Sequence, residues 1–285
     1  MKKIGILICD TGNPFWQAKI ALYESLAAGY GFDAIFRESS CPGDKEGQCR
    51  TLFDMLGEGY DAIVANPISE DNLVPAMRQS ATPIFDVGPK TVPELVRDAR
   101  NYFPIVVTDF EAQGRLAGEC LAAESGEHAD GWALIVGGLR DARHSEARCR
   151  GAYRALLKKF PQRRILTAYA DFRREEASRL ARDVLGEIDG VRCVFCANDL
   201  MALGMLDAMD ELDLSHRPLV AGVDAIQEAL RAVEAGRMLC TVELPHETVV
   251  RGVYRTLTDW FDGVRPGDAP VTESYLRART ESMPR

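Results

Sequence analysis

The sequence predicts an α/β fold with two lobes, each built on a parallel sheet flanked by helices. Short runs rich in Val and Ile alternate with segments whose apolar residues recur every three or four positions, along almost the whole chain. Such alternation is typical of strand–helix–strand units, whose strands pair in parallel. The chain has 285 residues, of which 46% are hydrophobic. This is enough for two domains of about 100–150 residues each.

The first strand and the first helix are predicted at the start of the chain. Residues 4–9 form an apolar run typical of a buried strand. Asn13 and Pro14 then favour a helix start, since Asn is a good N-cap and Pro suits the first helical turn. The connecting turn therefore follows the carboxyl end of a strand, where open α/β sheets bind their ligands. Apolar residues at helical spacing continue this helix, namely Trp16, Ile20, Tyr23 and Ala27.

The later strands and helices follow from the same two patterns. Val- and Ile-rich runs predict strands at residues 33–37, 61–65, 83–86, 104–108, 132–136, 165–169, 192–196, 219–222, 239–242 and 274–277. Apolar residues at helical spacing predict amphipathic helices between them. These residues are Leu116 with Cys120, Ala177 with Leu180 and Val184, and Val250 with Val253, Leu257 and Phe261.

The division into lobes is expected at short connections rather than at a linker. Residues 104–108 start a second run of strand–helix units, and a second crossing is expected near residues 243–245. We therefore expect one lobe from residues 1–107 with 244–271, and another from 108–243 with 272–285. Several short crossings are typical of a hinge between two lobes.

Composition excludes several classes of partner. The net charge of -9 argues against nucleic acid, because phosphate contacts need clustered Lys and Arg. No apolar run approaches the roughly 20 residues that a membrane span needs. The opening Met1-Lys2-Lys3 resembles the start of a signal peptide, but the apolar run after it is too short for one. Either a leader has been removed, which indicates a periplasmic or extracellular protein, or the protein is cytoplasmic.

The cysteines leave one pairing open and exclude another. Cys41 and Cys49 flank a short polar loop and either pair in an oxidising compartment or stay reduced. Cys193 and Cys196 have the spacing of a redox or metal motif, but they fall in the predicted strand 192–196. Residues three apart on a strand point to opposite faces, so these two thiols cannot share a metal ion or a disulfide.

Catalytic motifs are missing from the sequence. Two of the four histidines, His144 and His216, each neighbour an Arg, and no Cys or carboxylate cluster has metal-ligand spacing. No nucleophile elbow and no Gly-rich phosphate loop occurs. We therefore expect a binding protein that needs no metal and no cofactor, rather than an enzyme.

Six segments carry a family resemblance. They are Asn13-Pro14-Phe15-Trp16, residues 59–69 (Gly-Tyr-Asp-Ala-Ile-Val-Ala-Asn-Pro-Ile-Ser), Thr108-Asp109-Phe110 with Gly114, Arg148-Cys149-Arg150-Gly151, residues 194–204 (Val-Phe-Cys-Ala-Asn-Asp-Leu-Met-Ala-Leu-Gly) and Val220-Ala221-Gly222-Val223-Asp224. Together they resemble the type I periplasmic sugar-binding family, which includes ribose- and galactose-binding proteins. The related effector domain of lactose-repressor-type regulators is similar. The resemblance covers nearly the whole chain.

The resemblance implies two Rossmann-like lobes that close on a monosaccharide or related polyol. In the first lobe, Phe15 and Trp16 would stack on one face of the sugar, and Asn13 would bind a hydroxyl. In the second lobe, Phe172 would stack on the sugar, and Arg148 would donate to its ring or hydroxyl oxygens.

Further polar contacts are implied at the ends of strands. Asn198 and Asp224 would lie at the carboxyl ends of second-lobe strands, and Asn66 ends the strand at 61–65. Glu243 stands where the family often has Gln. Planar carboxylate, amide and guanidinium groups suit vicinal hydroxyls, which donate and accept hydrogen bonds together.

The sequence departs from the family at two places. Gly88-Pro89 stands where the family usually has Asp-Arg, and Asp86, two residues earlier, either compensates or does not. The segment Gly222-Val223-Asp224 lacks the aromatic residue that the family has in its middle position. These changes keep a sugar as the expected ligand and leave the particular sugar open.

Several candidates also have a purely structural interpretation. Asn13 is a helix cap, a ligand contact or both, and Arg148 lies among other arginines that form a solvated helix face if it is not a contact. Asp199 is expected to cap the helix that follows it. Asp224 favours the ligand site, since a buried carboxylate is costly without partners. The choice between a structural role and ligand contact stays open for Phe15, Trp16, Asn66, Phe172 and Glu243.

The sequence therefore predicts a sugar-binding protein of one of two kinds. The first is the solute receptor of an ABC-type importer, whose partner is a membrane permease. The alternative is a sensory domain that signals to a kinase or another regulatory partner. A sugar-modifying enzyme is the less favoured third possibility. In each case ligand stabilises a closed form only if it contacts both lobes.

Overall fold

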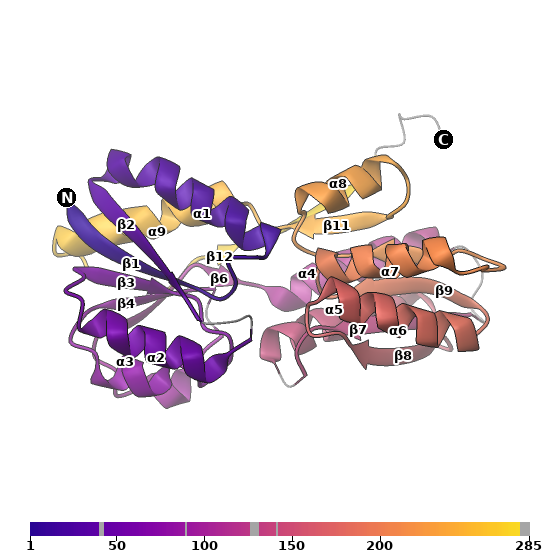
Figure 1. The fold of residues 1–285 in the computed structure, drawn as a ribbon, viewed down its shortest axis with the longest axis horizontal. Coiled ribbons are helices and arrows are strands. Elements are labelled where there is room, and N and C mark those ends of the chain that lie inside the picture. Colours follow the sequence, from indigo (N-terminus) through magenta and orange to yellow (C-terminus); the bar gives the residue numbers. More distant parts are fainter. Residues whose placement is uncertain (40–42, 89, 126–130, 141, 280–285) are drawn as a thin grey trace. The chain divides into compact units, whose positions relative to one another are not determined.

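The computed structural model describes residues 1–39, 43–88, 90–125, 131–140 and 142–279. The chain divides into two compact units. Unit 1 comprises Met1–Thr108 with Pro245–Glu273, and unit 2 comprises Asp109–Leu244 with Ser274–Arg285. Each unit is a sheet flanked by helices, which confirms the predicted α/β class (Figure 1).

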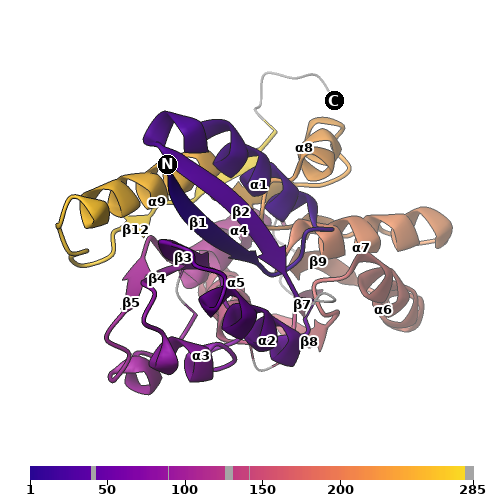
Figure 2. The same cartoon turned by 60° about the vertical axis from the view of Figure 1, so that its left-hand side comes forward.

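Unit 1 contains a five-stranded parallel sheet in the order β2-β1-β3-β4-β5. Its strands are β1 (Lys2–Ile8), β2 (Phe32–Glu38), β3 (Ala62–Ala65), β4 (Ile84–Val87) and β5 (Tyr102–Ile105). Its helices are α1 (Pro14–Ala27), η1 (Ala28–Tyr30), α2 (Lys45–Leu56), α3 (Val74–Gln79), η2 (Pro93–Val96) and α9 (His246–Phe261). Helices α1 and α9 lie on one face of this sheet, and α2 and α3 lie on the other (Figure 2).

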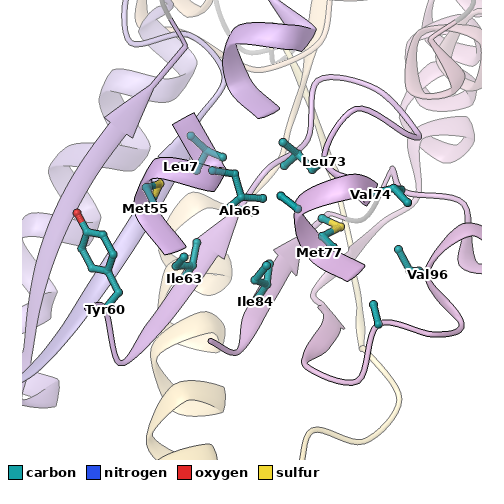
Figure 3. Packing of buried hydrophobic residues seen from close by; sticks show 13 residues of the cluster. Leu7, Met55, Tyr60, Ile63, Ala65, Leu73, Val74, Met77, Ile84 and Val96 are labelled. Atoms are coloured by element: carbon teal, nitrogen blue, oxygen red, sulfur yellow. The ribbon is translucent and has the colours of Figure 1, made fainter. Parts of the chain in front are cut away.

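Buried apolar side chains fix α2 and α3 on the sheet of unit 1. Met55 of α2 and Met77 of α3 pack with Ile63 and Ile84, which come from the neighbouring strands β3 and β4 (Figure 3). All four side chains are at most 1% exposed. Burial of such apolar side chains is the main force that holds the helices against the sheet.

One predicted strand is divided in two. Residues 104–108 were expected to be a single strand, but Val106 has a φ of 55° and interrupts it. The left-handed conformation is unfavourable for a β-branched residue and breaks the extended geometry. Strand β6 (Val107–Thr108) therefore leaves the main sheet of unit 1 and pairs in parallel with β12 (Val271–Thr272).

Unit 2 contains a six-stranded sheet in the order β13-β11-β10-β9-β7-β8. Its strands are β7 (Trp132–Gly137), β8 (Arg164–Tyr169), β9 (Val191–Cys196), β10 (Leu219–Ala221), β11 (Cys240–Glu243) and β13 (Tyr275–Ala278). Its helices are α4 (Phe110–Glu124), α5 (Arg143–Lys159), α6 (Arg174–Glu187), α7 (Asp199–Glu211) and α8 (Gln227–Glu234). The strands pair in parallel except for β13, an edge strand antiparallel to β11.

The cysteines of the described residues are free thiols. Cys193 and Cys196 both lie in β9 and are buried, which confirms their placement in a strand. The proposed pairing of Cys41 with Cys49 lies outside the described residues, because Cys41 is not among them. None of the helices in the described ranges combines the length and apolar character that a bilayer crossing requires.

Candidate functional site

The loop after β1 carries the aromatic candidates of unit 1. Asn13 caps α1, since its side chain accepts a hydrogen bond from the Phe15 N–H at 3.0 Å. The Phe15 and Trp16 rings meet edge to face with centroids 5.0 Å apart. The Lys19 ammonium lies 5.1 Å from the first centroid and 4.9 Å from the second. The structure thus confirms the capping role of Asn13 and places the Lys19 ammonium beside both aromatic rings.

His246 adds a further ring to this aromatic cluster. It starts α9, and its imidazole lies 4.6 Å from the Phe15 ring, centroid to centroid. Burial, and then the nearby Lys19 ammonium, lower the pKa of His246 to about 3. The imidazole is therefore neutral at physiological pH, so it supplies a ring surface and no charge.

Asn66 connects the carboxyl ends of three neighbouring strands of unit 1. Its Oδ1 accepts hydrogen bonds from the Lys90 ammonium at 3.1 Å and the Cys9 thiol at 3.3 Å. Its Nδ2 donates to the Val87 carbonyl at 2.6 Å, and Gln48 of α2 donates to the Asn66 carbonyl at 2.9 Å. These bonds fix the direction of the amide. Sequence reasoning identified Asn66 but missed the lysine, the thiol and the glutamine around it.

Asp86 is placed differently from the other candidates of unit 1. It lies within β4, is fully buried, and accepts hydrogen bonds from Thr91 at 3.0 Å and Tyr102 at 2.7 Å through Oδ2. Its Oδ1 has no hydrogen-bond partner among the described residues. Burial raises the pKa of Asp86 to about 6. Asp86 is therefore bound within unit 1, and a contact between Asp86 and the ligand stays a prediction.

The raised pKa of Asp86 predicts a pH-dependent stability. The folded state keeps the Asp86 proton up to about pH 6, whereas the unfolded state releases it near pH 4. The free energy of unfolding should therefore fall by about 3 kcal/mol, relative to the Asp86→Asn variant, as the pH rises from about 3 to about 7. Urea unfolding of both proteins at several pH values measures this difference. Asp33→Asn, at an exposed carboxylate of β2, is the control and should show no such trend relative to wild type.

Arg148 is the centre of the polar cluster in unit 2. Its guanidinium donates to Gln113 Oε1 at 2.9 Å, to the Ala197 carbonyl at 2.6 Å and to Asp224 Oδ1 at 3.4 Å. The Arg148 and Asp224 side chains are each only 9% exposed. The alternative of a solvated helix face is therefore wrong for Arg148. A fixed guanidinium beside a carboxylate offers paired donors and acceptors of the kind that vicinal hydroxyls require.

Close packing of α4 on α5 places this guanidinium. A Cβ built at Gly114 of α4 would lie 1.8 Å from the Arg148 carbonyl oxygen, and one at Gly151 of α5 would lie 2.1 Å from the Glu111 carbonyl oxygen. Only glycine allows the two backbones to approach so closely. The glycines of the family motifs therefore set where Arg148 stands relative to Gln113.

Asn198 and Phe172 lie together at the carboxyl ends of β9 and β8. Asn198 caps α7 by accepting from the Met201 N–H at 3.0 Å, and its Nδ2 donates to the Phe172 carbonyl at 3.3 Å. Phe172 has a φ of 61°, and its ring stacks on His144 with centroids 5.3 Å apart. One face of the Phe172 ring is thus covered by an imidazole that sequence reasoning did not connect with it.

Asp199 does not cap the helix that follows it, contrary to expectation. Asn198 is the N-cap of α7, and the Asp199 carboxylate instead accepts from the Ile226 N–H at 2.9 Å and the Thr241 hydroxyl at 2.6 Å. Burial, and then the nearby Asp224 carboxylate, raise the pKa of Asp199 to about 7. Asn and Asp are both good N-caps, so the local sequence does not decide between Asn198 and Asp199. Asp199 instead binds Ile226 and Thr241, which are distant in sequence.

Glu243 ends β11 and forms an ion pair with Arg277 on the edge strand β13. Its side chain is 29% exposed. Asp224 follows the neighbouring strand β10, and its N–H bonds to the Val242 carbonyl at 2.8 Å. Unit 2 therefore brings Glu243, Asp224 and Arg148 to the end of its sheet at which the parallel strands have their carboxyl termini.

Two clusters emerge within the separate units. We call the first the amide cluster; it comprises Asn66, Lys90, Cys9 and Gln48 in unit 1. We call the second the arginine cluster; it comprises Arg148, Gln113, Asp224 and the Ala197 carbonyl in unit 2. Both clusters follow the carboxyl ends of parallel strands, the usual position of ligand sites in open α/β sheets.

A family model for the periplasmic binding protein domain matches residues 4–259. The chain belongs to the periplasmic binding protein family. Among relatives of this family, the D-allose-binding periplasmic protein of Escherichia coli (strain K12) is 30% identical over 241 residues, which are 83% of this chain and 77% of that protein. The ribose import binding protein RbsB of the same organism is 25% identical over 88% of this chain and 82% of its own length.

Solved structures of periplasmic binding proteins share the fold. An ABC transporter periplasmic solute binding protein from Actinobacillus succinogenes 130z, with bound D-allose, superposes with a TM-score of 0.90 at 22% identity over 98% of both chains. A solute binding protein from Bacillus halodurans C-125, with bound myo-inositol, gives a TM-score of 0.83 at 23% identity over 97% of this chain and 94% of the other. These matches confirm the predicted type I fold of two α/β lobes. The relatives are solute-binding proteins rather than enzymes.

Proposed function

We propose that this protein binds a small carbohydrate, either a monosaccharide or a related polyol. The observation that carries the proposal is the arginine cluster, where a guanidinium and a carboxylate that are both 9% exposed are fixed at one sheet edge. Planar groups of this kind pair with the vicinal hydroxyls of a sugar. The 30% identity to a D-allose-binding protein supports the same class of ligand.

The proposed contacts come from both units. In unit 1 they are Asn13, Phe15, Trp16 and Asn66, and in unit 2 they are Arg148, Phe172, Asn198, Asp224 and Glu243. Lys90 and Gln113 join them as residues that orient Asn66 and Arg148. Aromatic rings suit the C–H faces of a sugar, while the polar groups suit its hydroxyl rim.

The transport role is part of the proposal. Named relatives include periplasmic and import binding proteins, so the best-supported role is that of a solute receptor for an ABC-type importer. In that role the sugar-loaded protein docks on a membrane permease, and the protein works in the periplasm. A pull-down of the permease by the sugar-loaded but not by the sugar-free protein would distinguish this role from a sensory one.

The experiment that tests the proposed function is a thermal-shift screen against pentoses, hexoses, polyols and sugar acids. Ligand at about 100 times its dissociation constant should stabilise the protein by roughly 2.7 kcal/mol. We expect a clear rise in Tm with one stereochemical class, confirmed by calorimetric titration. Absence of any shift across all four classes at millimolar ligand would overturn the proposal.

Trp16→Ala tests the aromatic contact in unit 1. Trp16 is half-buried beside Phe15, and loss of its ring should remove a stacking surface for the sugar. We expect sugar affinity to fall about tenfold, equivalent to about 1.4 kcal/mol, while the circular dichroism spectrum stays unchanged. The control is Tyr153→Ala, which removes an exposed aromatic ring from α5 of unit 2. Equal affinities for Trp16→Ala and wild type would remove Trp16 from the site.

A further inference from the structure

Asp199 and Thr241 form a buried pair that the proposed ligand contacts do not include. Asp199 is 1% exposed and Thr241 is fully buried. The Thr241 hydroxyl donates to Asp199 Oδ1 at 2.6 Å and accepts from the Ala225 N–H at 3.1 Å. Asp199 Oδ2 accepts from the Ile226 N–H at 2.9 Å. The pair therefore binds two consecutive backbone amides of one turn.

That turn, residues 224–226, starts with the candidate contact Asp224. Asp224 has a φ of 121° and Ala225 has a φ of 54°, so two successive residues with a Cβ adopt a conformation that favours glycine. Such a turn persists only where its surroundings hold it. The N–H groups of Ala225 and Ile226 donate to Thr241 and Asp199. The Asp224 N–H donates to the Val242 carbonyl at 2.8 Å.

Close packing shows that the surroundings are shaped for this carboxylate. A Cβ at Gly222 would lie 2.3 Å from Asp199 Oδ1 and 2.7 Å from the Met238 side chain. Glycine at this position lets the Asp199 carboxylate approach the end of β10. Because Asn198 already caps α7, the carboxylate of Asp199 is available for the turn.

We propose that Asp199 and Thr241 are positioning residues for the ligand, which act by holding residues 224–226 so that the Asp224 carboxylate meets the Arg148 guanidinium. This inference rests on the proposed function, since it assumes that Asp224 contacts a sugar. Neither positioning residue touches the ligand itself. Their effect on affinity must therefore pass through Asp224.

Thr241→Val tests the proposal, because valine keeps the shape of threonine and removes its hydroxyl. We expect the affinity of Thr241→Val for the sugar found in the screen to fall about tenfold in calorimetric titration. Thr241→Ser restores the hydroxyl and should recover affinity to within about twofold of wild type. The matched control is Thr256→Val in α9 of unit 1. The Thr256 hydroxyl donates to the Gly252 carbonyl of its own helix at 3.0 Å, and the affinity of this variant should not change.

A double-mutant cycle separates positioning from general damage. In the Asp224→Asn background, Thr241→Val should change affinity by less than about twofold, because the group it positions has already been altered. An equal tenfold loss in both backgrounds would overturn the proposal. A Thr241→Ser protein as weak as Thr241→Val would overturn it as well.

A measurement without ligand keeps the inference testable if no sugar binds. Hydrogen exchange of the Ala225 and Ile226 amides should accelerate at least tenfold in Thr241→Val, while the Met201 amide in α7 should keep its wild-type rate. Unchanged exchange at both turn amides would overturn the positioning role. If exchange accelerates in Thr241→Val but no sugar binds to the wild-type protein, the role of Thr241 in fixing residues 224–226 is supported. Only the proposed sugar-binding function is then overturned.

Discussion

Replacing Arg148 with methionine should abolish measurable sugar binding and lower the free energy of unfolding by about 3–5 kcal/mol. The substitution removes the guanidinium from between Gln113, the Ala197 carbonyl and the buried Asp224 carboxylate. Methionine fills a similar volume but donates no hydrogen bond, so the groups around it lose a donor that water cannot easily replace. Calorimetric titration measures the binding, and chemical denaturation measures the stability.

The matched control for this substitution is Arg154→Met on the same helix. Arg154 is exposed and pairs with Glu111 at 2.6 Å on the surface of unit 2. Surface ion pairs are worth about 0–1 kcal/mol, so this variant should keep both its stability and its affinity. If Arg148→Met bound sugar as tightly as Arg154→Met, the arginine cluster would not be the ligand site.

Gly114→Ala should destabilise the protein by about 3 kcal/mol and weaken sugar binding by more than tenfold. The new methyl group would lie 1.8 Å from the Arg148 carbonyl oxygen, and a backbone atom cannot move aside as the end of a side chain can. Helix α5 must shift away from α4, which carries Arg148 away from Gln113. Chemical denaturation and titration of the same preparation measure both effects.

Gly186→Ala is the control for the cost of a helical glycine. Gly186 lies in α6, and a Cβ there would meet nothing within 4 Å. This substitution should stabilise the protein by about 0.4–1 kcal/mol, because alanine restricts the unfolded chain. Should Gly114→Ala also be neutral or stabilising, the close approach of α4 and α5 would not be what positions Arg148.

Both substitutions, Arg148→Met and Gly114→Ala, test the placement of the Arg148 guanidinium in the arginine cluster. Arg148→Met removes the donor group itself, whereas Gly114→Ala leaves every polar group present and displaces the helix that carries one of them. A loss of affinity in the second variant therefore reports geometry rather than chemistry. Binding sites depend on both, since a guanidinium misplaced by about 1 Å no longer forms its hydrogen bonds.

Much of the fold could be predicted from the sequence because its signals are local. The Val- and Ile-rich runs became strands of the two sheets, with boundaries shifted by a residue or two. Asn13 with Pro14 marked the start of α1 correctly, since capping involves only neighbouring residues. The division of residues 104–108 at Val106 was missed. A β-branched residue rarely adopts a left-handed backbone, so the sequence predicts an extended conformation at Val106.

For the candidate site, local sequence patterns predict single residues, whereas long-range packing determines the partners of these residues. Sequence motifs identified Arg148, Asn198 and Asp224, because each follows a strand or begins a family motif. The partners of these residues come from far along the chain: Gln113 is 35 positions from Arg148, and Asp224 is 76 positions from it. Such pairs have no periodicity that a sequence window can detect.

The sequence by itself determined the α/β class, the approximate positions of the strands in the two main sheets, and the family to which the chain belongs. The tertiary structure alone decided that Asp86 faces the interior of unit 1, that Asn198 rather than Asp199 caps α7, and that Lys90 and Gln48 surround Asn66. The physical reason is the range of the interactions. Hydrophobic periodicity and capping act within a few residues of chain, whereas the direction of a buried polar side chain depends on donors and acceptors that only packing brings together.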